Sequence, residues 1–515
     1  MAQLVTSLFN SIYVTLPFVT CAVLLGIIFI LTTILTFVTT ITTIAWNPIA
    51  SQYFRFKGPK KSSKLTIAFF HPYCDTGGGG ERVLWCAINA MKRQFPEAHC
   101  IVYTGDVHVS GEQIINKAQN RFQIQNMNWM KDPDNGVKFI YLHKRAWVEA
   151  KTYPRFTLLG QSLGSIYLAW EAIMKLCPDI YIDTTGYAFT LPLFKNIGKC
   201  KVGCYVHYPT ISSDMLRLVK SRSSTYNNAS GISQSWILSS IKLRYYQIFA
   251  FLYKVAGKYS DVTMVNSSWT EDHIRSLWNS PRCDEKHPGN KCGEVHKLFP
   301  PCDNTEFLQI ERLFNRAEEM TKNIKIISLG QFRPEKDHPM QIRTMFELRK
   351  IVSERDWKRV RLVVIGGSRN EEDNQRIKEL QDLCKHLSVE ENVEFKINIP
   401  FGELKREMSE SMIGLHTMWN EHFGIAVVEM LAAGLITVAH RSGGPLMDII
   451  DESKEFQTGF LAVHDVEYAE SIAQILEMSN DARHCVIERA RSSVKRFSDT
   501  IFESEWIRVT TPLVS

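Results

Sequence analysis

Residues 65–93 read LTIAFFHPYCDTGGGGERVLWCAINAMKR. The apolar run Leu65–Phe70 is typical of a buried strand, and a glycine-rich loop, His71–Gly80, separates it from a helical segment at 81–93. Strand character resumes at Ala98–Tyr103. A strand, a glycine-rich turn, a helix and a second strand are the opening of a doubly wound parallel sheet, so this stretch predicts an α/β fold.

A second alternation of strands and helices begins near residue 324. Strand-like apolar runs, separated by helical segments, lie at Ile324–Leu329, Arg361–Ile365, Val393–Ile397 and Ile436–Ala439. The chain has 515 residues, which is too long for one hydrophobic core. We therefore predict two Rossmann-like domains that face a cleft, with ligands at the carboxyl ends of their strands.

The domain boundaries follow from these runs. The first Rossmann-like domain is expected at 65–312 and the second at 313–495. Residues 496–515 form a C-terminal segment, and whether it packs back on the first domain stays open at this point.

The N-terminal region has the character of a membrane anchor. No Lys, Arg, Asp or Glu precedes Arg55, and Leu16–Trp46 is almost entirely apolar residues and Thr. This length suffices to span a bilayer, and the basic n-region and cleavage site of a signal peptide are missing. We predict a short lumenal N-terminus and a transmembrane helix at 1–48, followed by a basic linker at 49–64. Positive charge beside such a helix marks the cytosolic side, so both domains are expected in the cytosol.

Composition excludes some partners and leaves one segment ambiguous. The net charge of +6 is modest, and no basic helix or alternation of basic and aromatic residues suggests nucleic acid. Residues 236–259 read WILSSIKLRYYQIFAFLYKVAGKY. This segment is either a core helix with one wet face or a helix that lies in the membrane interface, and the sequence does not decide between them.

Two glutamates stand eight residues apart in EHFGIAVVEMLAAG, residues 421–434. Glu429 is the one polar residue between Ile425 and Ala433, so we expect a helix that is buried all round and ends before Gly434. A carboxylate in such a helix is costly unless it is paired. Glu429 therefore either forms a structural ion pair or accepts hydrogen bonds from ligand hydroxyls. Glu421 alone would be a favourable charge near a helix N-terminus.

The E-x7-E pair resembles the signature of retaining GT-B glycosyltransferases that use nucleotide sugars. Further segments match that family in order: PPCD (300–303), GQFRPEKDH (330–338), VVIGGS (363–368), RSGGP (441–445) and TGFL (458–461). More closely, HPYCDTGGGGERVLW, CYVHYP, GQFRPEKDH and MWNEHFGIAVVEMLAAG look like the family of α-1,2-mannosyltransferases of the dolichol-linked oligosaccharide pathway. The resemblance covers nearly the whole chain after residue 65.

This resemblance implies an activity and a location. The expected reaction is transfer of two successive mannoses, with retention, from GDP-mannose to the dolichyl-diphosphate-linked trimannosyl chitobiose intermediate. The expected location is the endoplasmic reticulum membrane, single-pass, and other mannosyltransferases of the pathway are candidate partners. Protein cations and helix dipoles replace a metal in this fold, so no cofactor is expected. The alternatives are another donor, such as UDP-N-acetylglucosamine, and a non-catalytic membrane scaffold.

The resemblance also assigns donor-side roles. Glu421 would lie at the mannosyl group and oppose the positive charge of an oxocarbenium-like transition state, and Glu429 would hold the ribose. Lys336 and Arg333, in the loop that begins at Gly330, would supply cations for the departing GDP. Many relatives carry the arginine directly after the glycine, where this chain has Gln331, so Lys336 is the safer assignment.

Backbone groups and one histidine complete the expected site. The N–H groups of Phe423, Gly424 and Ile425 are expected to meet the diphosphate at a helix entrance. The loop Gly77, Gly78, Gly79 and Gly80 lacks the Lys-Ser/Thr of a P-loop, and in the family it faces the reaction centre from the acceptor domain. His207, at the end of a predicted strand, is the catalytic candidate near the acceptor hydroxyl, although a lone histidine is usually structural.

Overall fold

The computed structural model describes residues 64–122, 124, 127–212, 215, 236–278, 294–302, 304–310 and 324–514. The predicted anchor at 1–48 and almost all of the predicted basic linker lie outside these ranges. Within the described ranges, no helix combines the length and the apolar character needed to cross a membrane.

The first sheet has seven parallel strands in the order β3-β2-β1-β4-β5-β6-β7. This order confirms the doubly wound parallel arrangement expected from the opening stretch. The strands are β1 (Thr66–Phe70), β2 (His99–Thr104), β3 (Lys138–Tyr141), β4 (Ile180–Asp183), β5 (Lys201–Val206), β6 (Val262–Val265) and β7 (Glu294–Lys297).

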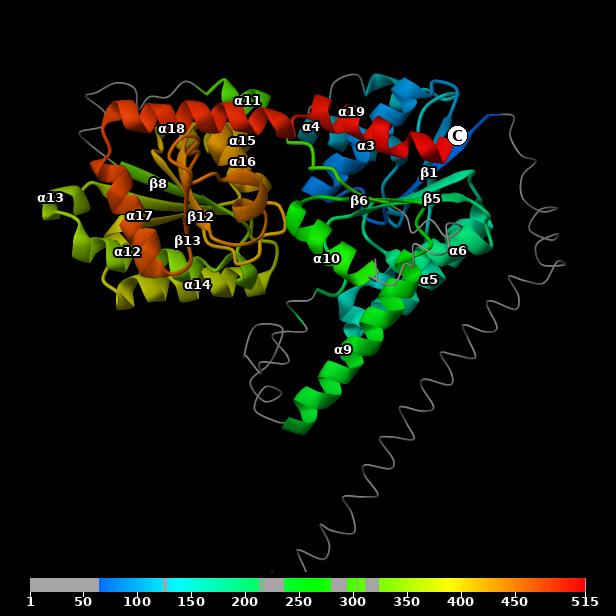
Figure 1. Ribbon diagram of the computed structural model, residues 1–515, viewed down its shortest axis with the longest axis horizontal. Coiled ribbons are helices and arrows are strands. Elements are labelled where there is room, and N and C mark those ends of the chain that lie inside the picture. Colours follow the sequence, from blue (N-terminus) through cyan, green and yellow to red (C-terminus); the bar gives the residue numbers. More distant parts are fainter. Residues whose placement is uncertain are drawn as a thin grey trace, which may run out of the picture. The chain divides into compact units, whose positions relative to one another are not determined.

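Helices cover both faces of this sheet (Figure 1). One core cluster joins apolar side chains of β1 and β2 to three helices, α3 (Gly79–Gln94), α4 (Gly111–Phe122) and α19 (Asp499–Val514). The other helices that accompany the sheet are α5 (Thr157–Lys175), α6 (Leu191–Asn196), α9 (Trp236–Gly257) and α10 (Ser268–Trp278).

The second sheet has six parallel strands in the order β10-β9-β8-β11-β12-β13. They are β8 (Ile324–Leu329), β9 (Val360–Gly366), β10 (Val393–Ile397), β11 (Ile413–His416), β12 (Ile436–His440) and β13 (Phe460–Ala462). The strand expected at Ile436–Ala439 is confirmed as β12, whereas β11 was not singled out in the sequence.

The helices around the second sheet form two layers (Figure 1). One layer holds α12 (His338–Ile351), α14 (Glu371–His386) and α17 (Asp465–Glu477), with α13 (Glu354–Trp357) beside it. The opposite layer holds α11 (Thr305–Leu308), α15 (Phe401–Glu410), α16 (Ile425–Ala432) and α18 (Asn480–Ser493). A short π-helical turn, η8 (Pro445–Ile449), follows β12.

Helix α3 begins two residues earlier than expected, at Gly79 instead of Glu81. The cause is local. The Glu81 carboxylate accepts hydrogen bonds from the backbone N–H groups of Thr76 (2.8 Å) and Gly77 (2.9 Å), so it closes the loop that precedes its own helix. Two donors of the loop before the N-cap Gly78 are thereby satisfied, and Gly79 and Gly80 form the start of the helix.

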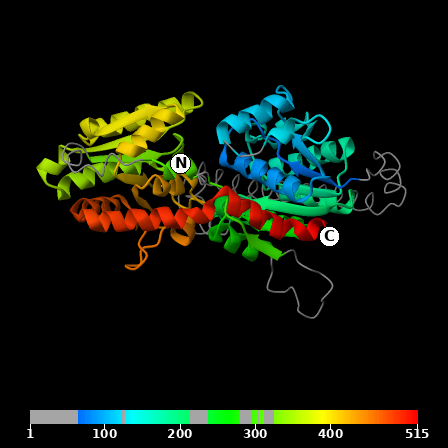
Figure 2. The ribbon, with the colours of Figure 1, turned by 90° about the horizontal axis from the view of Figure 1, so that it is seen from above.

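The C-terminal helix α19 packs against α3 and belongs to the core of the first sheet. Its inner face contributes Phe502, Trp506, Val509 and Leu513 to the same cluster as β1 and β2. Polar contacts tie its N-terminal half to α3: Arg82 pairs with Asp499 at 2.5 Å, and Asn89 donates to Glu503 at 2.9 Å. Figure 2 shows α18 and α19 in red, one after the other along the chain.

The ambiguous segment at 236–259 forms α9, and its two faces differ. Tyr246, Phe249 and Tyr253 are buried, so one face belongs to the core. Ile248 and Phe251 lie on the other face, where 42% and 63% of their surfaces are exposed. One face therefore packs in the core, and the exposed face is mostly apolar but also carries Arg244 and Gln247.

We predict that Trp506→Ala destabilises the first domain strongly. The side chain is fully buried, and loss of a buried Trp costs about 3–5 kcal/mol. Ile501→Ala on the same helix is the control, because Ile501 is 47% exposed and should cost little. Thermal unfolding of the full chain in detergent measures both. Equal midpoints for the two variants would contradict the assignment of α19 to this core.

Candidate active site

The carboxyl ends of β8 and β11 bring two loops together at one edge of the second sheet. Gly330 follows β8 and leads to Lys336, and His416 ends β11 and leads to Glu421. The two strands are neighbours in the sheet and run parallel, so their loops leave from the same edge.

An ion pair joins these two loops. Lys336 Nζ lies 2.5 Å from Glu421 Oε2 and 3.2 Å from Met418 Sδ, and the Glu421 side chain is 15% exposed. Burial alone would raise the pKa of Glu421, but His416 and Lys336 outweigh burial and hold that pKa well below its usual range. Glu421 is therefore ionised at neutral pH, as a group that opposes developing positive charge must be.

Hydrogen bonds from Thr417 and a helix cap at Asp337 fix the loop that carries Lys336. Thr417 Oγ1 donates to the carbonyl oxygens of Lys336 (2.9 Å) and Asp337 (3.1 Å). Asp337 adopts a left-handed conformation (φ 46°) and caps α12 by accepting from Met340 N–H. Gly330 borders the same lysine, because a Cβ there would lie 3.5 Å from Lys336 Cγ and Cδ.

Arg333 is placed differently from Lys336. Its side chain is 43% exposed and faces Glu335 at 3.8 Å. The structure therefore brings Lys336, and not Arg333, into contact with Glu421.

The entrance of α16 adjoins Glu421. Gly424 has φ +111°, a conformation that favours glycine, and its carbonyl accepts from Val427 N–H at 2.9 Å and Val428 N–H at 3.1 Å. The helix begins at Ile425, so the N–H groups of Ile425 and Ala426 precede the first helical hydrogen bond. Phe423 itself is buried against Phe299 and Phe497, so its side chain anchors the loop.

A second glycine loop braces Glu421 through its backbone. Gly444 N–H donates to Glu421 O at 2.8 Å, and a Cβ at Gly444 would collide with the Phe423 backbone. The close approach of Gly444 to Glu421 and Phe423 explains why the RSGGP segment has a glycine at this position.

The expectation that α16 is buried all round was wrong. Ile425, Ala426 and Glu429 are only partly buried, and residues at these spacings share one side of a helix. The helix therefore has one partly open side, and Glu429 lies on it, one turn after the entrance. Its end agrees with the sequence, since Gly434 follows the helix with φ +79°.

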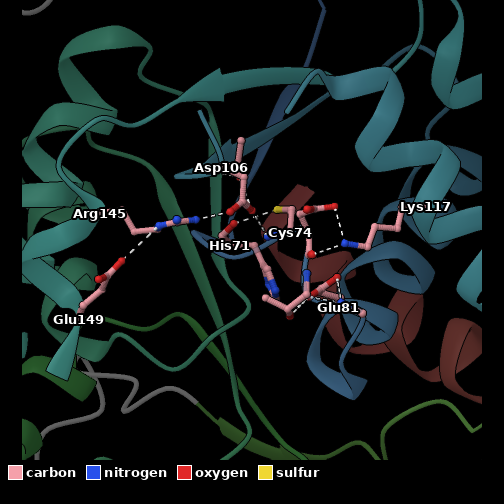
Figure 3. Close-up of polar contacts among 11 residues, drawn as sticks. His71, Cys74, Glu81, Asp106, Lys117, Arg145 and Glu149 are labelled. Carbon is pink, nitrogen blue, oxygen red and sulfur yellow. Dashed lines mark hydrogen bonds and ion pairs between the residues drawn. The ribbon is translucent and has the colours of Figure 1, made fainter. Parts of the chain in front are cut away.

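The glycine loop of the first sheet is closed by Glu81 (Figure 3). Two of its glycines have close neighbours. A Cβ on Gly79 would come within 2.6 Å of Ile425 Cδ1, and a Cβ on Gly80 would lie 3.5 Å from His207 Nε2. Gly77 has φ +77°, and Gly78 caps α3 in an extended conformation.

His207 directly follows β5, as expected for a residue at a strand end. Its Nε2 lies 3.0 Å from the carbonyl oxygen of Thr184. Since a carbonyl only accepts, Nε2 carries the proton and Nδ1 is left with its lone pair. Burial lowers the pKa of His207 to about 4, so the ring is neutral at pH 7 and its Nδ1 can accept a hydrogen bond.

Sequence reasoning missed a polar network beside the glycine loop. Asp106 accepts from Cys74 N–H at 2.7 Å and pairs with Arg145, as Figure 3 shows. His71 Nδ1 lies 2.8 Å from Thr184 Oγ1. His71 and Asp106 follow β1 and β2 closely, so the rule of polar residues at parallel strand ends could have found them.

Sequence reasoning also missed His416, which ends β11 and is 2% exposed. Its Nε2 lies 3.2 Å from Glu421 Oε2. The strand that carries it was not recognised, so its position at a strand end was hidden.

Comparison with known proteins places the chain in a family. A profile described as "ALG11 mannosyltransferase N-terminus" matches residues 64–278, and one described as "Glycosyl transferases group 1" matches residues 309–493. A human protein named "GDP-Man:Man(3)GlcNAc(2)-PP-Dol alpha-1,2-mannosyltransferase" is 52% identical over 86% of this chain and 85% of its own length. The chain belongs to this family. It is a glycosyltransferase.

Distant members carry the same name. The Caenorhabditis elegans protein is 43% identical over 88% of this chain and 92% of its own length, and the Kluyveromyces lactis protein is 34% identical over 87% and 78%. Among solved structures, a sucrose-phosphate synthase from Thermosynechococcus elongatus has a TM-score of 0.58 at 15% identity, covering 88% of this chain and 99% of that one. Such likeness supports a GT-B-like fold with two parallel sheets.

We predict that stability falls as the pH drops below neutral. Burial lowers the pKa of His71 to about 3 and those of His338 and His440 to about 4, against 6.5 for an ordinary histidine. The unfolded chain therefore binds protons first, so this stability is complete above pH 6.5 and is lost as the pH falls towards 4. Each of the three should cost about 1 kcal/mol at pH 5.5.

Thermal unfolding of the detergent-solubilised chain from pH 7.5 to 5 measures this loss. His338→Gln should flatten the dependence, whereas His464→Gln should not, because the His464 side chain is 59% exposed. A midpoint that stays constant over this range would contradict the prediction.

Proposed function

We propose that this chain transfers two successive α-1,2-linked mannoses from GDP-mannose to the dolichyl-diphosphate-linked trimannosyl chitobiose intermediate. The names of relatives that are 34–52% identical support this donor and acceptor. The observation that carries the proposal is the contact between Lys336 and Glu421, 2.5 Å apart at one sheet edge. It unites a cation and an ionised carboxylate, the two charges that departure of a nucleotide diphosphate from a sugar requires.

The two charges have separate tasks. As the glycosidic bond to the diphosphate breaks, negative charge develops on the leaving oxygen and positive charge on the sugar ring. Lys336 stabilises the diphosphate, and the N–H groups at the start of α16 supply further donors. Glu421 opposes the charge on the sugar. Glu429, on the partly open side of α16, accepts from the ribose hydroxyls.

On the acceptor side, His207 offers a neutral ring with an available Nδ1. Donation from Nε2 to Thr184 O fixes the ring and its tautomer. Nδ1 is thus suited to accept a hydrogen bond from the attacking hydroxyl and to orient it for attack. The glycines at 77–80 let the acceptor approach the backbone closely.

The reaction needs no metal in this proposal. Lys336 and helix N-termini provide the positive potential that a divalent cation supplies elsewhere. The alternatives of a UDP-N-acetylglucosamine donor and of a non-catalytic scaffold are not favoured, because the relatives share the name of one mannosyltransferase and the chain retains Glu421, Glu429 and Lys336.

The location we propose is the endoplasmic reticulum membrane, with a single anchor at 1–48 and both domains in the cytosol. A long apolar segment before Arg55 and the basic residues after it support this orientation. The outer face of α9 is a second surface that we propose to contact the membrane. Phe251 is 63% exposed there, and Phe156, 64% exposed, packs on Tyr245 of the same helix. Lys254 and Lys258 follow Phe251 in the sequence, and their positive charges would attract anionic lipid headgroups.

We expect Glu421→Ala to abolish transfer. The test is transfer of labelled mannose from GDP-mannose to the lipid-linked trimannosyl acceptor by detergent-solubilised chain. Loss of the carboxylate should lower kcat by at least about 100-fold. Glu372→Ala, at an exposed site on α14, is the control. EDTA should leave transfer intact. Two additions that require Glu421 support the proposal, and absence of transfer by the folded chain refutes it.

We expect Phe251→Glu to weaken use of the lipid-linked acceptor. A charge on the outer face of α9 should oppose contact with the bilayer, so KM for a full-length dolichol acceptor in liposomes should rise several-fold. KM for a short-chain, water-soluble acceptor should not change. Ile351→Glu is the matched control, because Ile351 is an equally apolar residue of the second domain with 52% of its surface exposed. Identical effects of both substitutions would contradict membrane contact through α9.

A further inference from the structure

His416 lies directly behind the Glu421 carboxylate. It is the last residue of β11, its side chain is 3% exposed, and its Nε2 lies 3.2 Å from Glu421 Oε2. The angle at this distance does not make a hydrogen bond, and no other group in the described ranges bonds to Nε2. A buried ring nitrogen thus points at the carboxylate without using its hydrogen-bonding capacity, which is costly unless the bond forms at some stage.

The ring of His416 is neutral at physiological pH. Burial lowers its pKa, contact with Glu421 raises it, and Lys336 lowers it again, with a net decrease. The other titratable groups around it are His338 on α12 and His440 at the end of β12, whose own pKa values His416 helps to lower. The hydroxyl of Tyr468 donates to the carbonyl oxygen of His416 at 2.9 Å and so fixes the His416 backbone.

Lys336 and His416 reach the same oxygen of Glu421. Lys336 holds Oε2 at 2.5 Å, closer than the 3.2 Å from His416. In the proposed reaction, the ammonium group of Lys336 is also the cation that a diphosphate attracts. When Lys336 turns to the diphosphate, Glu421 loses its closest partner, and a buried carboxylate without a donor tends to gain a proton.

We propose that His416 is a positioning residue that donates Nε2–H to Glu421 and keeps this carboxylate oriented and ionised while Lys336 serves the leaving diphosphate. The inference rests on the function proposed above. A neutral donor suits the task, because it orients the carboxylate without cancelling the negative charge that faces the sugar. A lysine or arginine at 416 would neutralise that charge.

Two substitutions of His416 test the proposal. His416→Leu removes the donor, and His416→Gln keeps an N–H near the position of Nε2. We expect His416→Leu to lower kcat for mannose transfer about 10- to 100-fold with little change in KM for GDP-mannose. Because Glu421 loses a donor in the substrate complex, its pKa there should rise, and the acid limb of the kcat profile should move to higher pH. His416→Gln should restore most of kcat and the original acid limb.

Controls separate this role from a structural one. His440→Leu also replaces a buried histidine at a strand end, but His440 bonds to Ser442 at 2.8 Å and not to Glu421, so it should leave the acid limb in place. A double-mutant cycle of His416→Leu and Glu421→Gln, read by thermal unfolding with saturating GDP to engage Lys336, measures the coupling of the two side chains without any catalysis.

The outcomes distinguish the two proposals. An active enzyme in which His416→Leu leaves kcat and the acid limb unchanged, or in which Gln restores nothing, would overturn the role of His416 alone. Additive effects in the unfolding cycle with GDP bound would do the same. A folded intact chain that transfers no mannose would overturn the proposed function, and this inference with it.

Discussion

The ion pair between Lys336 and Glu421 is the contact on which the rest of the site depends. Both side chains are largely shielded from water, so the pair costs desolvation and is a poor source of stability. Neighbouring parallel strands β8 and β11 supply the two loops, Thr417 fixes the lysine loop, and Gly444 fixes the glutamate loop. The second sheet thus holds the charges of Lys336 and Glu421 in place for ligand binding, although the pair adds little to the stability of the fold.

Much of this arrangement could be predicted because it follows from local pattern. The apolar runs and glycine turns predicted two parallel sheets, and E-x7-E marked Glu421 and Glu429. Two features escaped for physical reasons. Strand β11 has only four residues, Ile413–His416, and ends in a histidine, so it gives no clear apolar run. The open side of α16 depends on what packs around it, which apolar residues such as Ile425 and Ala426 do not reveal.

The first sheet was harder to read than the second. Its site network uses ordinary residues, His71, Asp106 and Arg145, without a spacing motif. Asp106 pairs with Arg145, and Cys74 links Asp106 to the His71 carbonyl, because β1, β2 and the segment after β3 end at one edge. The start of α3 was misplaced because Glu81 bonds back to Thr76 and Gly77. A side chain that satisfies its own helix entrance cannot be distinguished, in sequence, from a solvated glutamate.

Neutral histidines are the common element of both sheet edges. His207 follows β5 and His416 ends β11, and burial lowers the pKa of each, so each offers one N–H and one lone pair without charge. Near Lys336 and Glu421, this choice matters, since another buried cation would compete with Lys336 for the diphosphate or cancel the charge of Glu421. Uncharged rings can orient reacting groups through short contacts and still leave the field of the ion pair intact. Chemistry that separates charge between a sugar and a diphosphate requires that field to stay uncancelled.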